Sequence, residues 1–208
     1  MRILQIHNYY RIPGGECRVV DDERRLLEQS GDEVHLYAKH SEDLDDFGWW
    51  RRVRTLRQVP HNRTVVGELK ELVCRLRPDV AHVHNVFPMI SVGAYDVLCA
   101  LGVPVVQTVH NYRFLCPNGT FFVDGKVCED CHIGNFRPCV GKKCMRGSRV
   151  VSHYYSKAID YGWRKGIFAR AVTRFLALNE FTAQRLERAG VARTHIRICP
   201  NFVAVPDN

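Results

Sequence analysis

The chain has 208 residues, of which 46% are hydrophobic and 25% are charged, and its formal net charge is +8. This composition provides a sizeable core and excludes a globally disordered chain. No run approaches the roughly 18 apolar residues that a membrane-spanning helix needs, and the apolar stretch 3–6 is too short for a signal peptide. We therefore expect a cytoplasmic globular protein of one large domain or two small ones.

The elements follow from apolar periodicity and from Gly and Pro breaks. A strand over 2–6 precedes a Pro-Gly-Gly turn, and a helix over 16–29 follows, in which four of five residues at helical spacing are apolar: Val19, Val20, Glu23, Leu26 and Leu27. Next come a strand over 33–38, loop or a helical turn over 41–46, a helix over 64–76, a strand over 80–84, a helix over 89–101 and a strand over 103–109. A helix over 151–161, a strand over 174–178, a helix over 180–189, a strand over 195–199 and a linker over 200–208 complete the chain.

Strands that alternate with helices indicate βαβ units. The predicted fold is α/β: a single Rossmann-like domain with a mostly parallel sheet, helices on both faces and a cysteine-rich insert. Ligands of such sheets bind beyond the carboxyl ends of the strands. We therefore expect a cleft where polar residues follow the strands, namely His7, Asn8, His82, His84, Asn85, Thr108, His110, Asn111, Asn179 and Glu180.

Two features of this edge suit a phosphorylated ligand. Gly14 and Gly15 lie between the first strand and the first helix, where glycine admits a ligand and the helix N-terminus offers free N–H groups to a phosphate. A turn that needs positive φ would explain them equally simply. His110 follows a strand and can donate to a substrate hydroxyl or a leaving phosphate, although a structural role is equally common. Neither GxGxxG nor GxxxxGKS is present, which counts against a dinucleotide dehydrogenase and a P-loop NTPase.

Five of the nine cysteines fall within 116–144. Cys128 and Cys131 form a Cys-x₂-Cys pair, and with Cys116 before it and Cys144 after it four thiolates can close a tetrahedral, structural zinc site. Cys139 or His132 can replace one ligand, and a disulfide or free thiols are the alternatives. The surrounding Gly-, Pro- and Asn-rich loop has almost no core of its own, so it needs such a staple.

The basic residues are localised. Residues 1–104 carry 14 basic and 15 acidic side chains, whereas residues 105–208 carry 16 and 7. Aromatic and basic residues are interleaved in Trp49-Trp50-Arg51-Arg52-Val53-Arg54 and again over 154–170, a composition typical of contact with an anionic membrane surface. Nucleic acid, or a solvated basic loop, would account for the first segment as well.

Several segments together resemble the family 4 glycosyltransferases of the GT-B fold. These are Met-Arg-Ile-Leu-Gln-Ile-His-Asn at the start, Pro-Gly-Gly-Glu-Cys-Arg-Val-Val over 13–20, Pro-Asp-Val-Ala-His-Val-His-Asn over 78–85, Pro-Val-Val-Gln-Thr-Val-His-Asn-Tyr-Arg over 104–113, Asn-Glu-Phe-Thr over 179–182 and Pro-Asn-Phe-Val over 200–203. Some relatives carry a similar insert, about 112–150 here, whose cysteines correspond to Cys116, Cys128, Cys131 and Cys144. That resemblance leaves Cys139 outside the zinc set.

The resemblance implies retaining transfer of a sugar from a nucleotide-sugar donor to a glycan or lipid-linked acceptor, in cell-surface glycan synthesis. Such enzymes have two Rossmann-like domains, and the N-terminal one holds most of the acceptor. By similarity, Gly14 and Gly15 approach the donor diphosphate and His110 is the catalytic residue beside the donor sugar. The acceptor-binding residues implied are His84, Asn85, Asn111 and Arg113.

The family's donor-binding domain is not within these 208 residues. We expect residues 1–203 to be the N-terminal domain, with 204–208 starting the linker to a C-terminal donor-binding domain, and we expect the fragment alone to be inactive. The competing hypotheses are a zinc-stabilised nucleic-acid-binding module, which matches no common DNA-reading arrangement and so makes nucleic acid an unexpected partner, and one half of a nucleotide-sugar epimerase.

Overall fold

The computed structural model describes residues 1–12, 14–41 and 49–202. Its main sheet has six strands, all parallel, in the order β2-β1-β3-β4-β7-β8. In chain order these are β1 Arg2–Tyr9, β2 Glu33–His40, β3 Val80–Asn85, β4 Val105–Val109, β7 Val172–Ala177 and β8 Ile196–Ile198. The predicted α/β architecture with a parallel sheet is confirmed.

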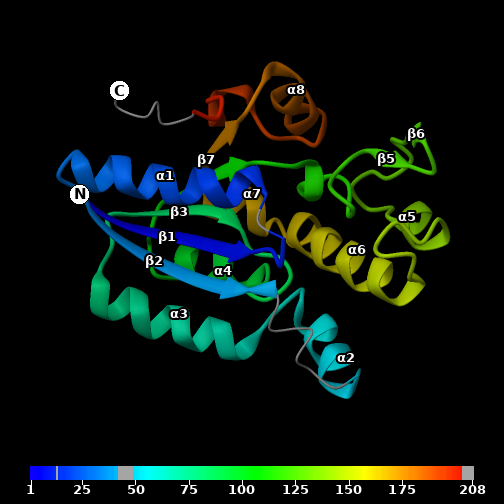
Figure 1. The fold of residues 1–208 in the computed structure, drawn as a ribbon, viewed down its shortest axis with the longest axis horizontal. Helices are drawn as coiled ribbons and strands as arrows, with labels where there is room; N and C mark the ends of the chain where they lie inside the picture. Colours follow the sequence, from blue (N-terminus) through cyan, green and yellow to red (C-terminus); the bar gives the residue numbers. More distant parts are fainter. Residues whose placement is uncertain (13, 42–48, 203–208) are drawn as a thin grey trace.

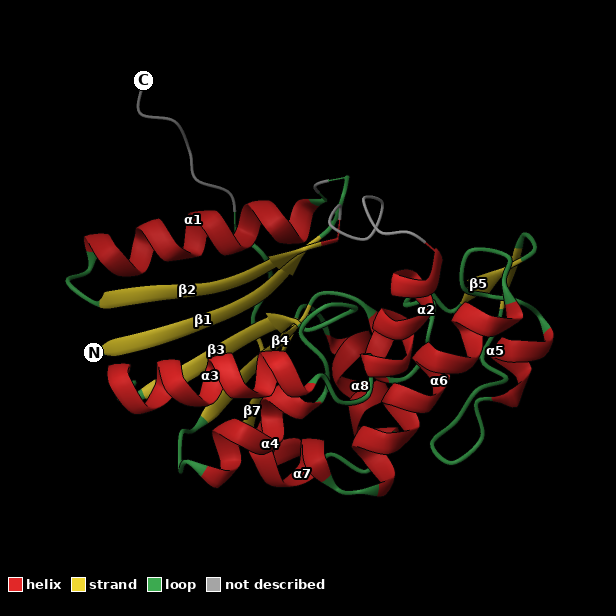
Figure 2. Ribbon diagram, turned by 90° about the horizontal axis from the view of Figure 1, so that it is seen from below, coloured by secondary structure: helices red, strands yellow, loops and turns green. Residues whose placement is uncertain are grey.

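Helices cover both faces of the sheet, as expected. Helix α1 (Gly15–Gln29) leads from β1 to β2, and α3 (Arg63–Leu76) leads back past β1 to β3, so right-handed crossovers put them on opposite faces. Figure 1 shows α1 and α3 on opposite sides of the sheet, and Figure 2 shows α4 (Gly93–Ala100) and α7 (Ile167–Ala171) on the same side as α3. Helix α8 (Glu180–Arg188) packs on β7 and β8.

The central strands are apolar because both of their faces are covered. Leu4 and Ile6 of β1 and Ala81 and Val83 of β3 are fully buried, whereas the edge strand β2 is half-exposed along its length. The buried stretch of β1 also includes Gln5, His7 and Asn8. Polar side chains inside an apolar sheet need partners, and the last two of these lie at the carboxyl end of the strand.

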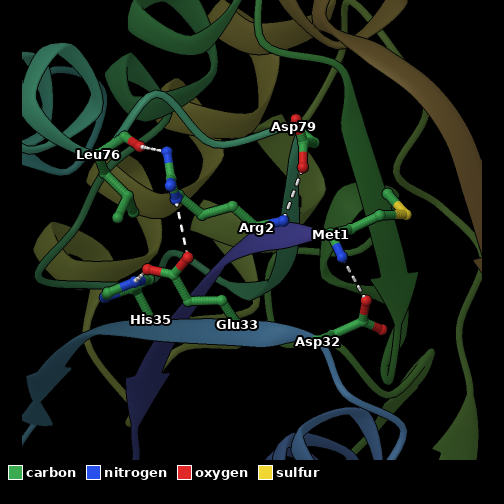
Figure 3. Close-up of polar contacts among 7 residues, drawn as sticks. All are labelled: Met1, Arg2, Asp32, Glu33, His35, Leu76 and Asp79. Carbon is green, nitrogen blue, oxygen red and sulfur yellow. Dashed lines mark hydrogen bonds and ion pairs between the residues drawn. The ribbon is translucent and has the colours of Figure 1, made fainter.

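Arg2 ties the opposite end of the sheet together (Figure 3). Its backbone N–H donates to Asp79 Oδ2 at 2.6 Å, and its guanidinium donates to Glu33 Oε2 at 3.1 Å and to the Leu76 carbonyl at 2.7 Å. The last contact satisfies a carbonyl at the end of α3, where no helical partner remains. Arg2 thus joins β1, β2 and the α3–β3 turn at the end of the sheet away from the carboxyl ends of the strands.

The cysteine-rich insert follows β4. It contains the 3₁₀ turn Tyr112–Phe114, the hairpin β5 (Phe122–Val123) with β6 (Lys126–Val127), and α5 (Arg137–Gly141), which packs on α6 (Arg149–Arg164). The expectation that this segment has almost no core is wrong: Phe136, Cys139 and Met145 are buried and join the main hydrophobic cluster. The reason is that α5 lies on α6, which supplies the apolar surface that the loop itself lacks.

Two further predictions differ from the structure, and a third lies outside the residues that it describes. Helix α2 (Trp49–Gln58) occupies a segment for which no element is predicted, and it is stabilised by packing on α6. Helix α4 begins at Gly93 rather than at residue 89, because the preceding residues form a turn. Residues 42–46 and 203–208, predicted as loop and linker, lie outside the described residues.

Candidate functional site

The carboxyl edge of the sheet gathers four histidines from three neighbouring strands. They are His7 on β1, His82 and His84 on β3, and His110 just after β4. His84 Nδ1 lies 2.9 Å from His110 Nε2, and the ring centroids of His82 and His84 are 4.2 Å apart. The His7 ring meets the His84 ring edge-on at 6.1 Å. The sequence prediction that these strand ends converge is therefore correct for the histidines.

A carboxylate that we did not single out from the sequence completes this cluster. Glu23 projects from α1, and its Oε1 lies 2.5 Å from His82 Nδ1 and 3.9 Å from His84 Nε2. The other ring nitrogen of His82 lies 2.8 Å from the Thr108 hydroxyl. The available signal is the position of Glu23 within the apolar stripe of α1, because a charged residue on a core-facing stripe needs a buried partner.

Burial keeps three of these imidazoles, those of His7, His84 and His110, neutral at pH 7. Desolvation lowers the pKa of His7 to about 3 and that of His110 to about 4, and it holds the pKa of His84 well below its ordinary value. Electrostatic repulsion between neighbouring imidazoles in their protonated forms lowers these pKa values further, whereas attraction to the Glu23 carboxylate raises the pKa of His110. At neutral pH His110 is therefore a hydrogen-bonding group and not a proton-donating imidazolium.

The N-terminus of α1 lies at the same edge. Gly14 precedes the helix with φ −100° and no side chain caps the first turn. A Cβ at Gly14 or Gly15 would meet no atom within 4 Å, and neither residue has positive φ. The turn therefore does not need glycine for its own geometry, contrary to the simpler structural explanation, and no side chain among the described residues caps the first N–H groups of α1, which suit an anion.

Asn111 and Arg113 lie beside this helix start. Asn111 Nδ2 donates to Glu16 Oε2 at 3.1 Å, and its Oδ1 accepts from the Arg113 N–H at 3.0 Å. The Arg113 guanidinium stacks over Tyr10 at 5.7 Å and over Tyr155 at 5.6 Å. Burial raises the pKa of Glu16, which Asn111 and Arg113 partly offset. These contacts fix Asn111 and Arg113 near the carboxyl ends of the strands.

Asn85 has a structural role in this arrangement. Its Nδ2 donates to the carbonyls of Asn8 and Phe87, and its Oδ1 accepts from the Phe87 N–H. Asn8 in turn donates to the Ser41 hydroxyl and accepts from the Met89 N–H. These two amides hold the loops after β1 and β3 in place, and Asn85 is buried.

The strand end at β7 does not join the histidine cluster. Asn179 Oδ1 accepts from the N–H and the hydroxyl of Thr182, so it caps α8. Glu180 forms an ion pair with Arg193. The polar pair that we expected to line the cleft therefore stabilises a helix start.

The insert brings its cysteines to one place. Cys116, Cys128, Cys131, Cys139 and Cys144 line a cavity of about 10 Å³, and Lys142 Nζ donates to Cys128 Sγ at 3.3 Å. All nine cysteines are free thiols, so no disulfide alternative is formed. Cys139 is 1% exposed, and His132 lines a different cavity, between the insert and α8.

The distances also identify groups that are compact enough to hold an ion. Within the described ranges, Glu23, His82 and His84 form the one set of His, Cys, Asp or Glu side chains whose three ligand atoms lie within 4.8 Å of one another. The cysteine sulfurs are more widely spaced. In a tetrahedral site with Zn–S bonds of about 2.3 Å, they would be drawn to roughly 3.8 Å from one another.

Comparison with known proteins gives one family. The family model described as Glycosyltransferase Family 4 matches residues 13–205. No curated protein matches the chain.

Two of the solved structures that share the fold have a TM-score of 0.51. They are the UDP-GlcNAc 2-epimerase from Methanocaldococcus jannaschii (12% identity, TM-score 0.51) and the S. aureus MnaA–UDP co-structure (11% identity, TM-score 0.51). Each match covers 95% of this chain, and the chain spans 45% and 43% of the respective structures. At this identity the likeness concerns the fold alone.

Proposed function

Because the chain belongs to Glycosyltransferase Family 4, we propose that it forms the acceptor-side domain of an enzyme that transfers a sugar from a nucleotide-sugar donor to an acceptor hydroxyl with retention of configuration. The observation that carries the proposal is the edge shared by the open helix start at Gly14–Gly15 and the buried pair His84–His110. A phosphate-binding turn and a neutral imidazole on one edge suit a substrate that has both a diphosphate and a sugar.

The donor diphosphate binds at the start of α1. The first N–H groups of this 15-residue helix carry the positive end of its dipole, and no capping side chain occupies them. Gly14 and Gly15 let phosphate oxygens approach the backbone, because no side chain fills the space beside it. That space is open, since a Cβ at either position would meet no atom within 4 Å. In support, the S. aureus structure with the same fold contains UDP.

His110 lies beside the donor sugar and hydrogen-bonds to it. Its low pKa means that it does not protonate the leaving diphosphate at neutral pH. Its contribution is to orient the sugar and to stabilise positive charge that develops at the anomeric carbon as the glycosidic bond breaks. As the nucleoside diphosphate leaves with the bonding electrons, the acceptor oxygen bonds to that carbon and its proton passes to the departing phosphate oxygen.

The acceptor is a glycan or lipid-linked glycan of cell-surface synthesis, and Asn111, Arg113 and His84 shape its side of the site. Arg113 supplies a fixed cation, because Tyr10 and Tyr155 hold its guanidinium from both sides. Asn85 contributes indirectly by fixing the loop after β3, since its amide is engaged with backbone groups.

We also propose a structural zinc ion held by Cys116, Cys128, Cys131 and Cys144. The chemistry of the donor set fits, because four thiolates satisfy zinc without an open position and all four line one cavity. The resemblance to relatives with a similar insert leaves Cys139 outside the set, and its side chain belongs to the main hydrophobic cluster. Glu129 lies between Cys128 and Cys131 and forms an ion pair with Arg185 of α8. Zinc that orders the two cysteines would therefore also hold the insert against α8.

The same enzyme would meet its acceptor at an anionic membrane surface. Helices α2 and α6 pack together near the end of the sheet where the strands terminate (Figure 2). Trp50 on α2 is 73% exposed, Val150 on α6 is exposed, and Arg57 of α2 donates to the Tyr154 hydroxyl of α6. No helix among the described residues is long and apolar enough to cross the bilayer, so contact would be peripheral.

The test compares two polypeptides with UDP- and GDP-sugars. We expect no turnover from the 208-residue chain and transfer from the complete protein in which a C-terminal donor-binding domain follows it. In that protein, His110→Ala lowers kcat by about 100-fold while the fold is kept. Turnover by the 208-residue chain alone, or unchanged kcat in the variant, contradicts the respective part of the proposal.

Epimerisation is the second candidate, because the M. jannaschii structure with this fold is a UDP-GlcNAc 2-epimerase. Incubating the complete protein with UDP-GlcNAc and no acceptor distinguishes the two activities. Appearance of the C2 epimer in the proton NMR spectrum supports epimerisation, whereas a glycosidic product that forms only with acceptor supports transfer.

A further inference from the structure

Glu23 is a buried acid that the proposed transfer reaction does not use. Its side chain is 17% exposed, it belongs to the sheet-facing side of α1, and its carboxylate lies among imidazoles from β3. Burying a carboxylate costs free energy unless polar or charged partners compensate it. The nearest candidate partners of Glu23 are the rings of His82 and His84.

The distances favour a shared proton over a shared metal ion. Glu23 Oε1 and His82 Nδ1 are 2.5 Å apart, which is a close ion-pair contact. Two ligands of one zinc ion, each about 2.0–2.1 Å from it, would lie about 3 Å or more apart. A proton on His82 Nδ1, facing the carboxylate, is therefore the arrangement that this contact favours.

The second imidazole near this carboxylate, that of His84, can be in either of two neutral tautomers. His84 is fully buried and neutral, so it carries one N–H, on either Nδ1 or Nε2. Nε2 has no hydrogen-bond partner among the described residues and lies 3.9 Å from Glu23 Oε1. A proton on Nε2 is attracted to the carboxylate, whereas a lone pair there would be repelled by it.

Through their shared hydrogen bond, the tautomer of His84 determines the tautomer of His110. With its proton on Nε2, His84 presents a lone pair at Nδ1, and the atom 2.9 Å away, His110 Nε2, must donate. His110 is also neutral, so its Nδ1 then carries a lone pair.

We propose that Glu23 is a positioning residue that selects the Nε2–H tautomer of His84 and, through it, of His110, so that His110 Nδ1 accepts a hydrogen bond from a hydroxyl of the bound sugar. The identity of that ligand rests on the proposed function, whereas the tautomers do not. His110 Nδ1 is buried and has no partner among the described residues.

The surroundings agree with an acceptor at this nitrogen. A cavity of about 10 Å³ is lined by His84, Asn85, Thr108, His110, Asn111 and Arg113, and it has room for about one water-sized group such as a hydroxyl. The ionisable neighbours are His7 from β1, which meets His84 edge-on, His82, which lies against Glu23, and Arg113, which lines the cavity. Among these groups Glu23 is the one with a negative charge, and it lies on the His82 and His84 side of the cluster.

The test reads the tautomers by long-range ¹H–¹⁵N NMR of the histidine rings in the 208-residue chain, with His110 assigned by the signal lost in His110→Gln. We expect a protonated Nε2 and a bare Nδ1 at His110 and at His84. In Glu23→Gln, whose amide keeps the shape without the charge, the His110 signals move toward a mixture of both tautomers. Glu23→Asp retains more of the wild-type pattern.

Glu28→Gln is the matched control, because Glu28 lies on the same helix, is exposed and pairs with Arg24. It leaves the His110 signals unchanged. A proton on His110 Nδ1 in the wild-type chain overturns the proposal without any variant, and so does a Glu23→Gln spectrum identical to wild type in a folded protein. Zinc-induced shifts confined to the His82 and His84 rings would also overturn it, since they would make the cluster a metal site.

A further consequence separates this inference from the proposed function. In the complete protein, Glu23→Gln is expected to raise KM for the donor sugar more than Glu23→Asp does. If the tautomers are as stated and no transfer is found, the proposed function fails and the positioning by Glu23 stands.

Discussion

His84 and His110 follow one another across neighbouring strands, and a single hydrogen bond of 2.9 Å between Nδ1 and Nε2 joins them. Each ring also borders another histidine or a carboxylate, and burial keeps both neutral. Protonation of one histidine of the cluster therefore opposes protonation of its neighbours.

The first prediction concerns pH. Because the pKa of His7 is about 3 and that of His110 about 4 in the folded chain, the unfolded chain takes up protons first as pH falls below about 6.5. The free energy of unfolding is then constant above that pH and decreases as pH falls toward 4. We expect a loss of about 2 kcal/mol or more between pH 7.5 and 5, measured by urea unfolding.

His7→Leu should reduce this slope, since it removes one buried imidazole whose ring nitrogens have no partner among the described residues. His153→Gln, at an exposed position on α6, is the control and should leave the slope unchanged. Equal stability at both pH values would contradict the prediction.

The second prediction uses two helical glycines with opposite surroundings. A Cβ at Gly162 would lie 2.3 Å from a Phe168 ring atom, whereas a Cβ at Gly67 would meet nothing within 4 Å. Gly162→Ala should therefore destabilise the chain by about 1–3 kcal/mol through overpacking. Gly67→Ala should stabilise it by about 0.5–1 kcal/mol, because alanine favours the helix. Denaturant midpoints that shift in the same direction would refute the packing described here.

The third prediction tests the turn before α1. Gly15→Ala creates no contact and should leave the melting temperature unchanged or slightly higher. In the complete protein it should raise KM for the nucleotide-sugar about tenfold or more, because the methyl group stands where phosphate oxygens approach the backbone. A variant with lower stability and unchanged KM would assign the glycine to the fold instead.

The fourth prediction concerns the insert. Elemental analysis should find about one zinc per chain, and a chelator should lower the melting temperature. Cys131→Ser should lose the metal, whereas Cys74→Ser, at an exposed position on α3, should keep it. Cys139→Ser should also keep zinc although it changes a buried core position. A metal-free wild-type chain with an intact fold would remove the site.

The fifth prediction addresses the membrane surface. The chain should bind anionic phospholipid vesicles at low salt and release them as salt increases, in a flotation assay. Trp50→Ala and Arg54→Gln on α2 should weaken binding, whereas Arg75→Gln at the exposed end of α3 should not. Absence of binding at low salt would exclude the surface as a membrane contact.

The sheet and its flanking helices could be predicted because their signals are local: continuous apolar strands, amphipathic helices and Gly or Pro stops. Helix α2 could not, since its mostly arginine-rich sequence is fixed by a tertiary contact with α6. The core of the insert was hidden for a similar reason, because Phe136 and Met145 join the main hydrophobic cluster of the domain.

Within the site, proximity of the strand ends was predictable from parallel topology, which brings His84 beside His110. Whether a polar side chain faces a ligand or a backbone group was not, and Asn85 and Asn179 turn toward the backbone. Glu23 carried a visible signal as the one charged residue in an apolar stripe. Its two imidazole partners lie 59 and 61 positions further along the chain, beyond any local pattern.

Gly15 and Glu23 stand on the same rigid helix, about 12 Å apart along its axis. A bound ligand that displaced the first turn of α1 would therefore also move the Glu23 carboxylate relative to β3. Such a displacement would change the distances from the carboxylate to His82 and His84, which are 2.5 Å and 3.9 Å in this structure.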